Sequence, residues 1–367
     1  MSSPFQQSLH DRRLAAPLIE QIHESAGRIS RTVRIMEVCG THTVAIRRSG
    51  VHSLMPQNML LLSGPGCPVC VTPTAYIDNA LSLLHDSRVT IVSFGDMLKV
   101  PGSDGKNLAA YMGAGRVRIV YSPAELTSIA RGSSGPVVFL AIGFETTIPT
   151  VAAAYLHARR AGVDNLFLYT AFKTVPPALH ALLDSPDRNL DGFLLPGHVS
   201  VIIGEHPYRF LENTGGVPGV ITGFEPLDLL RGIAALVKQI ERGEQRVENA
   251  YRRAVRPEGN PKAREISRQL LEPSDALWRG FGTIPASGLS LRADYMDADA
   301  RLHFSLPDLR NIEPAGCSCA QVLQGRVRPI DCPLFANACT PESPVGPCMV
   351  SSEGTCAASF RYGDTPL

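Results

Sequence analysis

The chain lacks an excess of charge of either sign and has no long hydrophobic run. Its 367 residues include 35 Lys and Arg against 34 Asp and Glu. A formal net charge of +1 gives no strong field to attract nucleic acid or an anionic membrane. No stretch reaches the roughly 20 apolar residues that span a bilayer, and the opening "MSSPFQQSLHDRRLAAPLIEQIHES" has no continuous apolar core of a secretory signal. We therefore expect a cytoplasmic protein that binds neither nucleic acid nor membrane.

Cysteine is absent from the long middle of the chain, between Cys70 and Cys317. Structural disulfides are rare in the reducing cytoplasm, and cysteines used as small hydrophobic residues would be scattered. The cysteines instead form two sets, which indicates metal binding or thiol chemistry. The amino-terminal set is Cys39, Cys67 and Cys70, and the carboxy-terminal set is Cys317, Cys319, Cys332, Cys339, Cys348 and Cys356.

The first two thirds of the chain alternate between short apolar runs and segments of helical periodicity. The runs are apolar throughout, as in strands buried on both faces of a parallel sheet. Their alternation with helices predicts doubly wound α/β architecture. The runs are "VRIMEV", "MLLLS", "VTIVSF", "VRIVYS", "VVFLAIG", "LFLYTA", "GFLLP" and "VPGVITG".

Changes in composition indicate three domains. The small-residue segment "ARGSSGP", at 130–136, is the best candidate for a break between two α/β halves. From about residue 241 the chain changes to two charged helices and then to a tail rich in Pro, Gly and Cys. The tail has too few aliphatic residues for a core of its own, and a metal centre would supply the missing stability. We predict α/β domains over 1–132 and 133–240 and a loop- and helix-rich domain over 241–367.

Polar loops follow five of the predicted strands, at the ends where ligands bind in open parallel sheets. Cys39 in "CGTHT" precedes a helix, whose amino-terminal dipole is expected to lower the pKa of the thiol and favour the metal-binding thiolate. The other cleft candidates are His42, Asp96 of "FGDM", Glu145 of "GFETT" and His198 of "PGHVS". Each has a structural alternative, such as a helix cap or a packed side chain.

Cys67 and Cys70 lie three residues apart in the Gly/Pro-rich turn "GPGCPVC". A Cys-x-x-Cys pair can close as a disulfide or supply two metal ligands. Two thiolates do not complete a tetrahedral site, and Cys39, one strand away, is a candidate third. Three thiols in adjacent loops favour either a partly open metal site or a thiol relay.

The tail holds its six cysteines as spaced singles and has no Cys-x-x-Cys pair of the kind that zinc ribbons use. Such spacing suits a [4Fe–4S] cluster held by four thiolates. Spacing alone does not decide which two cysteines stay free, although the Cys-x-Cys at Cys317 and Cys319 suggests one ligand beside one free thiol.

Taken together, "CGTHT", "GPGCPVC", "FGDM", "GFETT", "PGHVS" and the cysteine-rich tail resemble the HypD family of [NiFe]-hydrogenase maturation factors. The resemblance extends over about 34–358. It implies two similar α/β domains, a [4Fe–4S] domain, and a redox-active scaffold that assembles the Fe(CN)2CO unit, with a transient iron carrying cyanide and CO as cargo. It also implies two partners, the small chaperone HypC and the cyanide donor HypE.

The resemblance further implies roles for individual cysteines. Cys39 matches the thiolate that holds the nascent iron, and Cys67 and Cys70 match a redox-active pair beside it. The family pattern C-x14-C-x6-C-x16-C implies cluster ligation by Cys317, Cys332, Cys339 and Cys356. Cys319 and Cys348 are then a dithiol that passes electrons from the cluster. The one departure is Ala320, where the family has Gly, and it leaves the ligand assignment intact.

Two other functions compete with an assembly scaffold. One is a stand-alone iron–sulfur disulfide reductase, whose amino-terminal cysteines act on a diffusible substrate. The other is an ordinary α/β binding protein with a structural cluster. The nucleotide-binding motif G-x-x-x-x-G-K-[ST] is not present.

Overall fold

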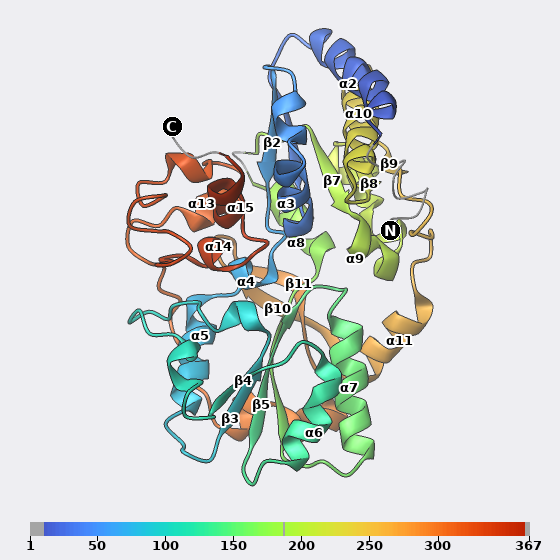
Figure 1. The fold of residues 1–367 in the computed structure, drawn as a ribbon. Helices are drawn as coiled ribbons and strands as arrows, with labels where there is room; N and C mark the ends of the chain where they lie inside the picture. The colour runs from blue at the N-terminus through green and yellow to red at the C-terminus, as the bar shows by residue number, and fades with distance from the viewer. Residues whose placement is uncertain (1–10, 186–187, 364–367) are drawn as a thin grey trace.

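The computed structural model of the chain describes residues 11–185 and 188–363 (Figure 1). Its strands are β1 Val33–Glu37, β2 Met59–Ser63, β3 Thr90–Ser93, β4 Val117–Ile119, β5 Val137–Gly143, β6 Leu166–Phe172, β7 Gly192–Pro196, β8 Gly219–Thr222, β9 Val247–Asn249, β10 Leu271–Trp278 and β11 Gly282–Leu291. They form a parallel sheet of order β2-β1-β7-β8-β9, a parallel sheet of order β4-β3-β5-β6, and the antiparallel hairpin β10–β11.

The two parallel sheets confirm the predicted α/β architecture, but the chain is shared between them in an unexpected order. The larger sheet combines two separate stretches, 33–63 and 192–249, whereas the smaller sheet takes its strands from 90–172. The boundary expected near residue 132 falls between β4 and β5, which belong to the same sheet, so it does not divide the two sheets. A segment of small residues indicates a turn but does not reveal which strands pair. Strand pairing here joins residues far apart in sequence.

Helices pack on the sheets and on one another. In the larger lobe, α10 covers β7 and β8 and contacts α2. The buried face of α10 includes Leu229, Ile233, Leu236 and Val237, each of which contributes about 2 kcal/mol through burial. The helices are α2 Arg12–Gly27, α3 Gly40–Arg48, α4 Pro68–Val71, α5 Thr74–Leu83, α6 Leu126–Arg131, α7 Ile148–Arg160, α8 Val175–Leu183, α9 Gly197–Ile203, α10 Pro226–Arg242, α11 Pro261–Leu270, α12 Ala300–His303, α13 Cys319–Leu323, α14 Pro347–Val350 and α15 Thr355–Tyr362.

Short helical turns complete the element order of the described residues. The 3-10 turns are η1 Val51–Leu54, η2 Gly95–Met97, η3 Leu108–Tyr111, η4 Pro123–Glu125, η5 His206–Tyr208, η7 Ala293–Ala298 and η8 Pro329–Asp331. The turn η6, Leu211–Gly215, is π-helical. In the part of the chain that the structure describes, no helix is long and apolar enough to cross a membrane.

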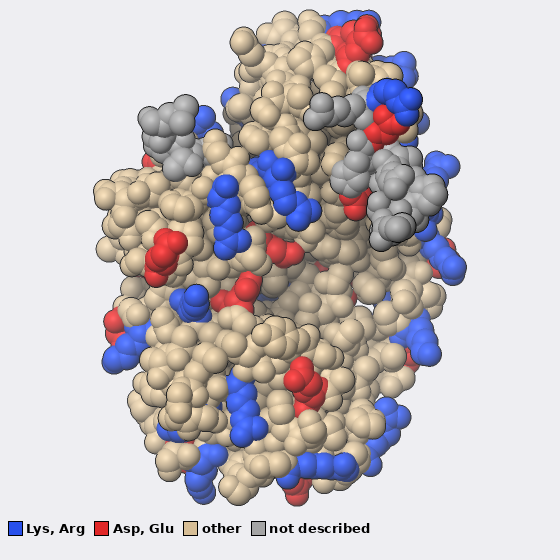
Figure 2. Space-filling view, in the orientation of Figure 1, with Lys and Arg blue, Asp and Glu red and all other residues tan. Residues whose placement is uncertain are grey.

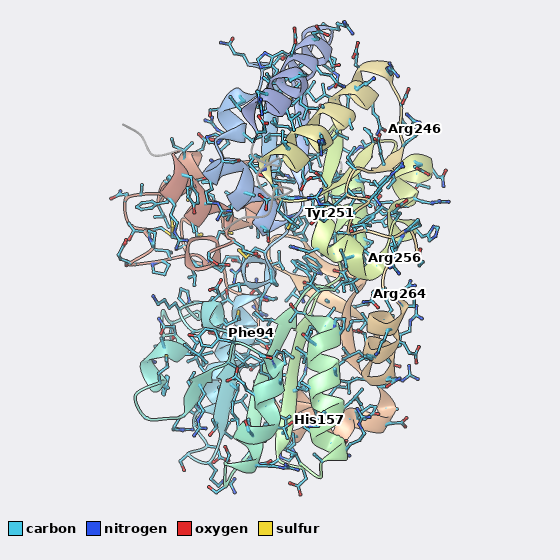
Figure 3. The ribbon with its side chains drawn as sticks, turned by 45° about the vertical axis from the view of Figure 1, so that its right-hand side comes forward. Phe94, His157, Arg246, Tyr251, Arg256 and Arg264 are labelled. Carbon is cyan, nitrogen blue, oxygen red and sulfur yellow. A yellow bond between two sulfur atoms is a disulfide. The ribbon has the colours of Figure 1, made fainter. Side chains whose placement is uncertain are left out.

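The two sheets form separate lobes that the chain connects several times. Two connections, 63–90 and 172–192, run between the sheets. A third descends after β9 along one side of the molecule to α11, where Tyr251, Arg256 and Arg264 mark its path (Figure 3). The surface is hollowed between the lobes, with acidic side chains at the edge of the hollow (Figure 2). The cysteine-rich tail lies beside both lobes, with α14 packed on α4 and α15 packed on α3 (Figure 1).

Candidate metal and thiol site

Cys39 follows β1 and is the N-cap residue of α3. The loop "GPGCPVC" packs directly against it, because the Gly40 amide donates a 3.0 Å hydrogen bond to the carbonyl of Gly66. A Cβ atom at Gly66 would lie 2.3 Å from the Cα atom of Cys39, so only glycine allows this approach. The sequence therefore places the first cysteine against the turn that carries Cys67 and Cys70.

Cys67 and Cys70 are joined by a disulfide, with their Cα atoms 5.2 Å apart. Pro68 begins the short helix α4 between them, and the amide of Cys70 donates to the sulfur of Cys67 at 3.1 Å. Both cysteines are buried. The sulfur of Cys70 lies 3.9 Å from the carbonyl oxygen of Pro347, the residue before Cys348. The disulfide therefore faces the cysteine-rich tail.

The expectation of a lowered Cys39 pKa is wrong. Burial raises the pKa of the Cys39 thiol to about 12, and the negative charge of Glu353 adds to this. Hydrogen bonds from His42 and Thr41 act in the opposite direction but do not compensate. The free-energy cost of burying a thiolate away from water is larger than the stabilisation that a helix amino terminus gives it. The thiol is therefore protonated, and a metal ion that bound to it would have to displace the proton.

The imidazole of His198, rather than that of His42, contacts the Cys39 thiol. The Nε2 atom of His198 lies 3.4 Å from the Cys39 sulfur, because β1 and β7 are neighbours in the larger sheet. Burial lowers the pKa of His198 to about 4, so its imidazole is neutral. His42 instead lies 3.1 Å from the carbonyl oxygen of Gly223. The ring of Phe224 packs on both imidazoles, at centroid distances of 4.8 and 4.9 Å.

A loop of the tail, residues 351–354, closes over the Cys39 region. The hydroxyl of Thr41 donates to Glu353 at 2.6 Å, and the hydroxyl of Ser351 donates to Asp96 at 2.9 Å. Asp96 comes from the smaller sheet's lobe, so this loop joins both lobes and the tail. Asp96 is thus placed at the site as expected. Glu353 is a site residue that sequence reasoning missed, although it is the one acidic residue in the loop "SSEGTC" beside the last cysteine.

Arg279 is a second residue that the sequence did not reveal. Its guanidinium is buried, donates to the carbonyl of Thr72 and the hydroxyl of Thr74 at 3.0 Å each, and pairs with Glu313. Its amide donates to the carbonyl of Val71, at the end of α4. Arg279 therefore ties the disulfide-bearing turn to the β10–β11 hairpin.

Glu145 is buried and is not among the residues that contact the Cys39 thiol. One carboxylate oxygen accepts a 2.8 Å hydrogen bond from the amide of Val175, and the other has no partner among the described residues. Burial raises the pKa of Glu145 to about 7. The side chain thus joins β5 to the start of α8.

This pKa makes a prediction about stability. The unfolded glutamate ionises above its model value of 4.5, whereas the folded one keeps its proton to about 7. The unfolded state therefore loses its proton first, and stability falls as pH rises through this window. The variant Glu145→Gln keeps the acceptor for Val175 and escapes this penalty. The free energy of unfolding of Glu145→Gln minus that of wild type is expected to be about 3 kcal/mol larger at pH 8 than at pH 4.

Urea denaturation at both pH values measures this difference. The exposed Glu258, changed to Gln, is the matched control and should give no pH-dependent gain. An equal pH dependence for wild type and Glu145→Gln would contradict the assignment of a protonated, buried Glu145.

The tail's cysteines converge on one small cavity. All six line it, together with apolar residues such as Phe335 and Met349: Cys317, Cys319, Cys332, Cys339, Cys348 and Cys356. The amide of Val345 donates to the Cys339 sulfur at 3.3 Å. A Cβ atom at Gly346 would lie 2.6 Å from the sulfur of Cys317. Apolar walls, close backbone and N–H···S bonds are the surroundings that tune an iron–sulfur cluster, so the residues present fit such a group.

The sulfurs do not form the compact site of a single ion. Among the described residues, no three His, Cys, Asp or Glu side chains are grouped to hold one metal ion. Four thiolates on one zinc lie about 4 Å apart, since each Zn–S bond is about 2.3 Å. In a [4Fe–4S] cluster each thiolate binds a different iron, so the ligands lie further apart. The described walls of the cavity supply six thiols and no histidine or carboxylate, a donor set that suits a cluster held by four thiolates.

Cys348 is carried by α14, which packs on the disulfide-bearing helix α4, and Cys319 is next to Cys348 in the cavity wall. Their thiols contact each other, and both residues belong to the same hydrophobic core as Cys67 and Cys70. Cys339 belongs instead to the tail's own small core, against which Cys332 packs. The two cysteine sets, far apart in sequence, are thus parts of one region that runs from Cys39 through the disulfide to the cavity.

Comparisons with known proteins agree with this arrangement. The family model described as "HypD: Hydrogenase formation hypA family" matches residues 13–363. The hydrogenase maturation factor HypD2 of Bradyrhizobium diazoefficiens is 41% identical over 98% of this chain and 97% of its own length. The hydrogenase maturation factor HypD of Escherichia coli is 42% identical over 94% of each chain. A putative hydrogenase expression/formation protein of Methanocaldococcus jannaschii is 41% identical over 97% of this chain and 99% of its own. The chain therefore belongs to the HypD family of hydrogenase maturation factors.

Proposed function

We propose that this chain is a redox-active scaffold on which the Fe(CN)2CO unit of a [NiFe] hydrogenase is assembled. It works with a small chaperone of the HypC kind and accepts cyanide from a HypE-type donor. The observation that supports this most is the continuity of Cys39, the Cys67–Cys70 disulfide and the six-cysteine cavity within one region. An ordinary binding protein has no need of such a series of thiols.

Cys39 would hold the iron as cargo. Low-spin iron with cyanide and CO needs a soft, electron-rich ligand and a dry surrounding, and a buried thiolate supplies both. The Cys39 thiol must lose its proton when iron binds. The neutral His198 imidazole, 3.4 Å from the sulfur, can accept a hydrogen bond from the thiol before the proton leaves.

The Cys67–Cys70 disulfide would store oxidising equivalents next to the iron. Its reduction to two thiols takes up two electrons and two protons. Cys319 and Cys348 are the dithiol best placed to supply them, since they share the core that contains the disulfide. When bound in the cavity by Cys317, Cys332, Cys339 and Cys356, a [4Fe–4S] cluster supplies single electrons. Burial of Cys39, the disulfide, Cys319 and Cys348 keeps water and small oxidants away from the relay.

Infrared spectroscopy of the anaerobically purified complex with its chaperone partner tests the proposal. Bound cyanide and CO give stretching bands in a region free of protein absorption, and these bands are expected together with iron in excess of the cluster. A complex prepared from cells that make hydrogenase, with cluster iron but no such bands, would count against an assembly scaffold.

Replacing Cys67 by alanine is expected to stop the redox step and leave partner binding within about twofold of wild type, since both sulfurs are buried away from the surface. Hydrogenase activity of cells that carry the variant should fall at least tenfold, on the order expected for loss of one partner in a thiol exchange. Co-purification with the chaperone partner and hydrogenase assays measure the two effects. Thr72→Ala, at the C-cap of the same short helix, is the control. Unimpaired maturation with Cys67→Ala would refute the relay.

A stand-alone disulfide reductase is the second candidate. Its substrate would have to reach the Cys67–Cys70 disulfide, whose sulfur-bearing residues are 3% and 0% exposed. Steady reduction of a small disulfide by the purified chain, without a partner, would favour this function over an assembly scaffold.

A further inference from the structure

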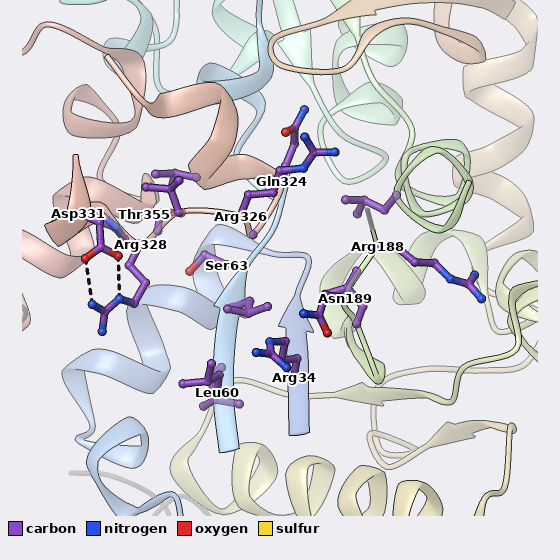
Figure 4. A pocket seen from close by; sticks show the side chains of 18 of the residues that line it. Arg34, Leu60, Ser63, Arg188, Asn189, Gln324, Arg326, Arg328, Asp331 and Thr355 are labelled. Carbon is purple, nitrogen blue, oxygen red and sulfur yellow. Dashed lines mark hydrogen bonds and ion pairs between the residues drawn. The ribbon is translucent and has the colours of Figure 1, made fainter. Parts of the chain in front are cut away.

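A pocket of about 840 Å³ lies apart from the thiol region, around the free edge of the larger sheet (Figure 4). Cys39 and the cysteines of the tail do not line it. Its walls come from β2, from the end of α3, from η1, and from the tail segment 324–331 that also includes η8. Nothing in the thiol chemistry proposed above uses this pocket.

The pocket wraps around β2, which is the edge strand of its sheet. All five residues of β2 line it, so it extends along the whole strand. Leu60 is paired with Arg34 of β1 and lies on the same face of the sheet. Arg47, which is close to Glu37, lies on the opposite face and also lines the pocket. An occupant therefore meets both faces and the edge of the strand at once.

The backbone of β2 presents unused hydrogen-bonding groups to the pocket. The Val33 amide donates to Asn58, and the Gly64 amide donates to Glu37, each at 2.8 Å. In a parallel ladder, alternate residues bond to opposite neighbours. These two bonds mean that the amide and carbonyl of Leu61 point away from β1, toward the open edge. Neither group bonds to another described residue.

The charge of the pocket is strongly one-sided. Among the residues that the structure describes, five arginines line it against one carboxylate, Asp331, which is paired with Arg328 at 2.9 Å. The guanidinium of Arg34 makes no ion pair with a described residue, and that of Arg326 donates to the hydroxyl of Ser185. Figure 4 shows Arg34 beside the strands, with Arg326 and Arg328 on the tail segment opposite. The complementary ligand is acidic.

We propose that this pocket binds an extended acidic segment of a partner protein, which adds to β2 as a further parallel or antiparallel strand. An open strand edge supplies main-chain hydrogen bonds, and side chains that alternate between the two faces give specificity. Alternate side chains of a strand share one face, so a segment that alternates acidic and apolar residues would direct its acidic side chains to the face that carries Arg34 and its apolar side chains to the opposite face. A small anion would satisfy the arginines but leave the edge of β2 unused.

Fluorescence anisotropy of the purified full chain with a labelled Glu-Val-Glu-Val-Glu-Val peptide tests this proposal. We expect binding that weakens with added salt and no binding of the matched Lys-Val-Lys-Val-Lys-Val peptide. Arg34→Gln should weaken binding about fivefold, in the range of a partly exposed charge contact. Arg118→Gln is the control, because Arg118 is an exposed arginine on β4, the edge strand of the smaller sheet.

The strand geometry has a separate test. Leu61→Pro removes the outward amide without breaking a bond to β1, as proline is tolerated on edge strands, and it should weaken binding at least about tenfold. In the wild-type chain, peptide should slow hydrogen exchange of the Leu61 amide, a measurement that needs no variant. Absence of peptide binding, or peptide binding without this protection, would overturn the proposal. Tight binding of inorganic triphosphate that displaces the peptide and is insensitive to Leu61→Pro would instead identify a small-anion site.

Discussion

Cells that carry Cys39→Ala in this chain are expected to lose mature [NiFe] hydrogenase. Cys39 is the one free thiol of the amino-terminal set, since Cys67 and Cys70 are joined in a disulfide. Loss of even an outer-sphere partner typically costs 10–100-fold in metal affinity. Loss of the ligand itself should lower hydrogenase activity by at least about 100-fold, at a stability cost of only about 1 kcal/mol.

The measurement combines hydrogenase activity with spectra of the purified variant. The brown chromophore of the cluster should persist, because Cys39 is not among the residues that line the six-cysteine cavity. The cyanide and CO bands should vanish. Iron in excess of the cluster should vanish with them, and normal maturation with Cys39→Ala would refute the role of Cys39.

Cys39→Ser separates ligation from hydrogen bonding. A serine hydroxyl keeps the contact with the Nε2 atom of His198 and nearly the same volume, but it is a hard ligand that suits low-spin iron poorly. We therefore expect serine to fail almost as completely as alanine. Restoration of activity by serine would mean that the hydrogen bond to His198, rather than the soft sulfur, matters.

Much of the fold could be predicted because the strands carry a strong local signal. The run "VVFLAIG" is buried at every position of β5, as expected for a strand between neighbours and under helices. The gathering of polar loops at the strand ends was also predictable, and in the structure His198 contacts Cys39 while Asp96 accepts a hydrogen bond from the tail loop that reaches Thr41. These inferences need only the period of a strand and the rule for parallel sheets.

The strand order could not be predicted, because it depends on contacts between distant residues. β1 pairs with β7, where Ile35 lies opposite Gly192, outside the predicted first domain. The same limitation hid Glu353 and Arg279, whose roles exist only once the tail and the hairpin are folded against α3 and α4. Local sequence also gave the wrong sign for the pKa of Cys39, because the depth of its burial is a property of the whole fold.

Cys332→Ala is expected to have the largest effect on the tail. The tail's own core is small, with Phe335, Cys339, Met349 and Ala357 as its buried members. Such a core supplies little stability, so most of it should come from a bound cluster. The visible chromophore should disappear, and iron content should fall from about four atoms per chain to below about one. The tail should then become sensitive to proteases, and activity should be lost with it.

Cys319→Ala is the matched control, because Cys319 lines the same cavity and is more deeply buried than Cys332, so a loss of packing alone should affect it at least as much, but it is proposed as a thiol of the relay rather than a ligand. It should keep the chromophore and the iron while losing hydrogenase maturation. Absorbance, iron analysis and limited proteolysis under anaerobic conditions measure these differences. If Cys332→Ala kept its full iron while Cys319→Ala lost it, the two cysteines would have to exchange roles. The dithiol would then include a sulfur that packs against the tail's own small core.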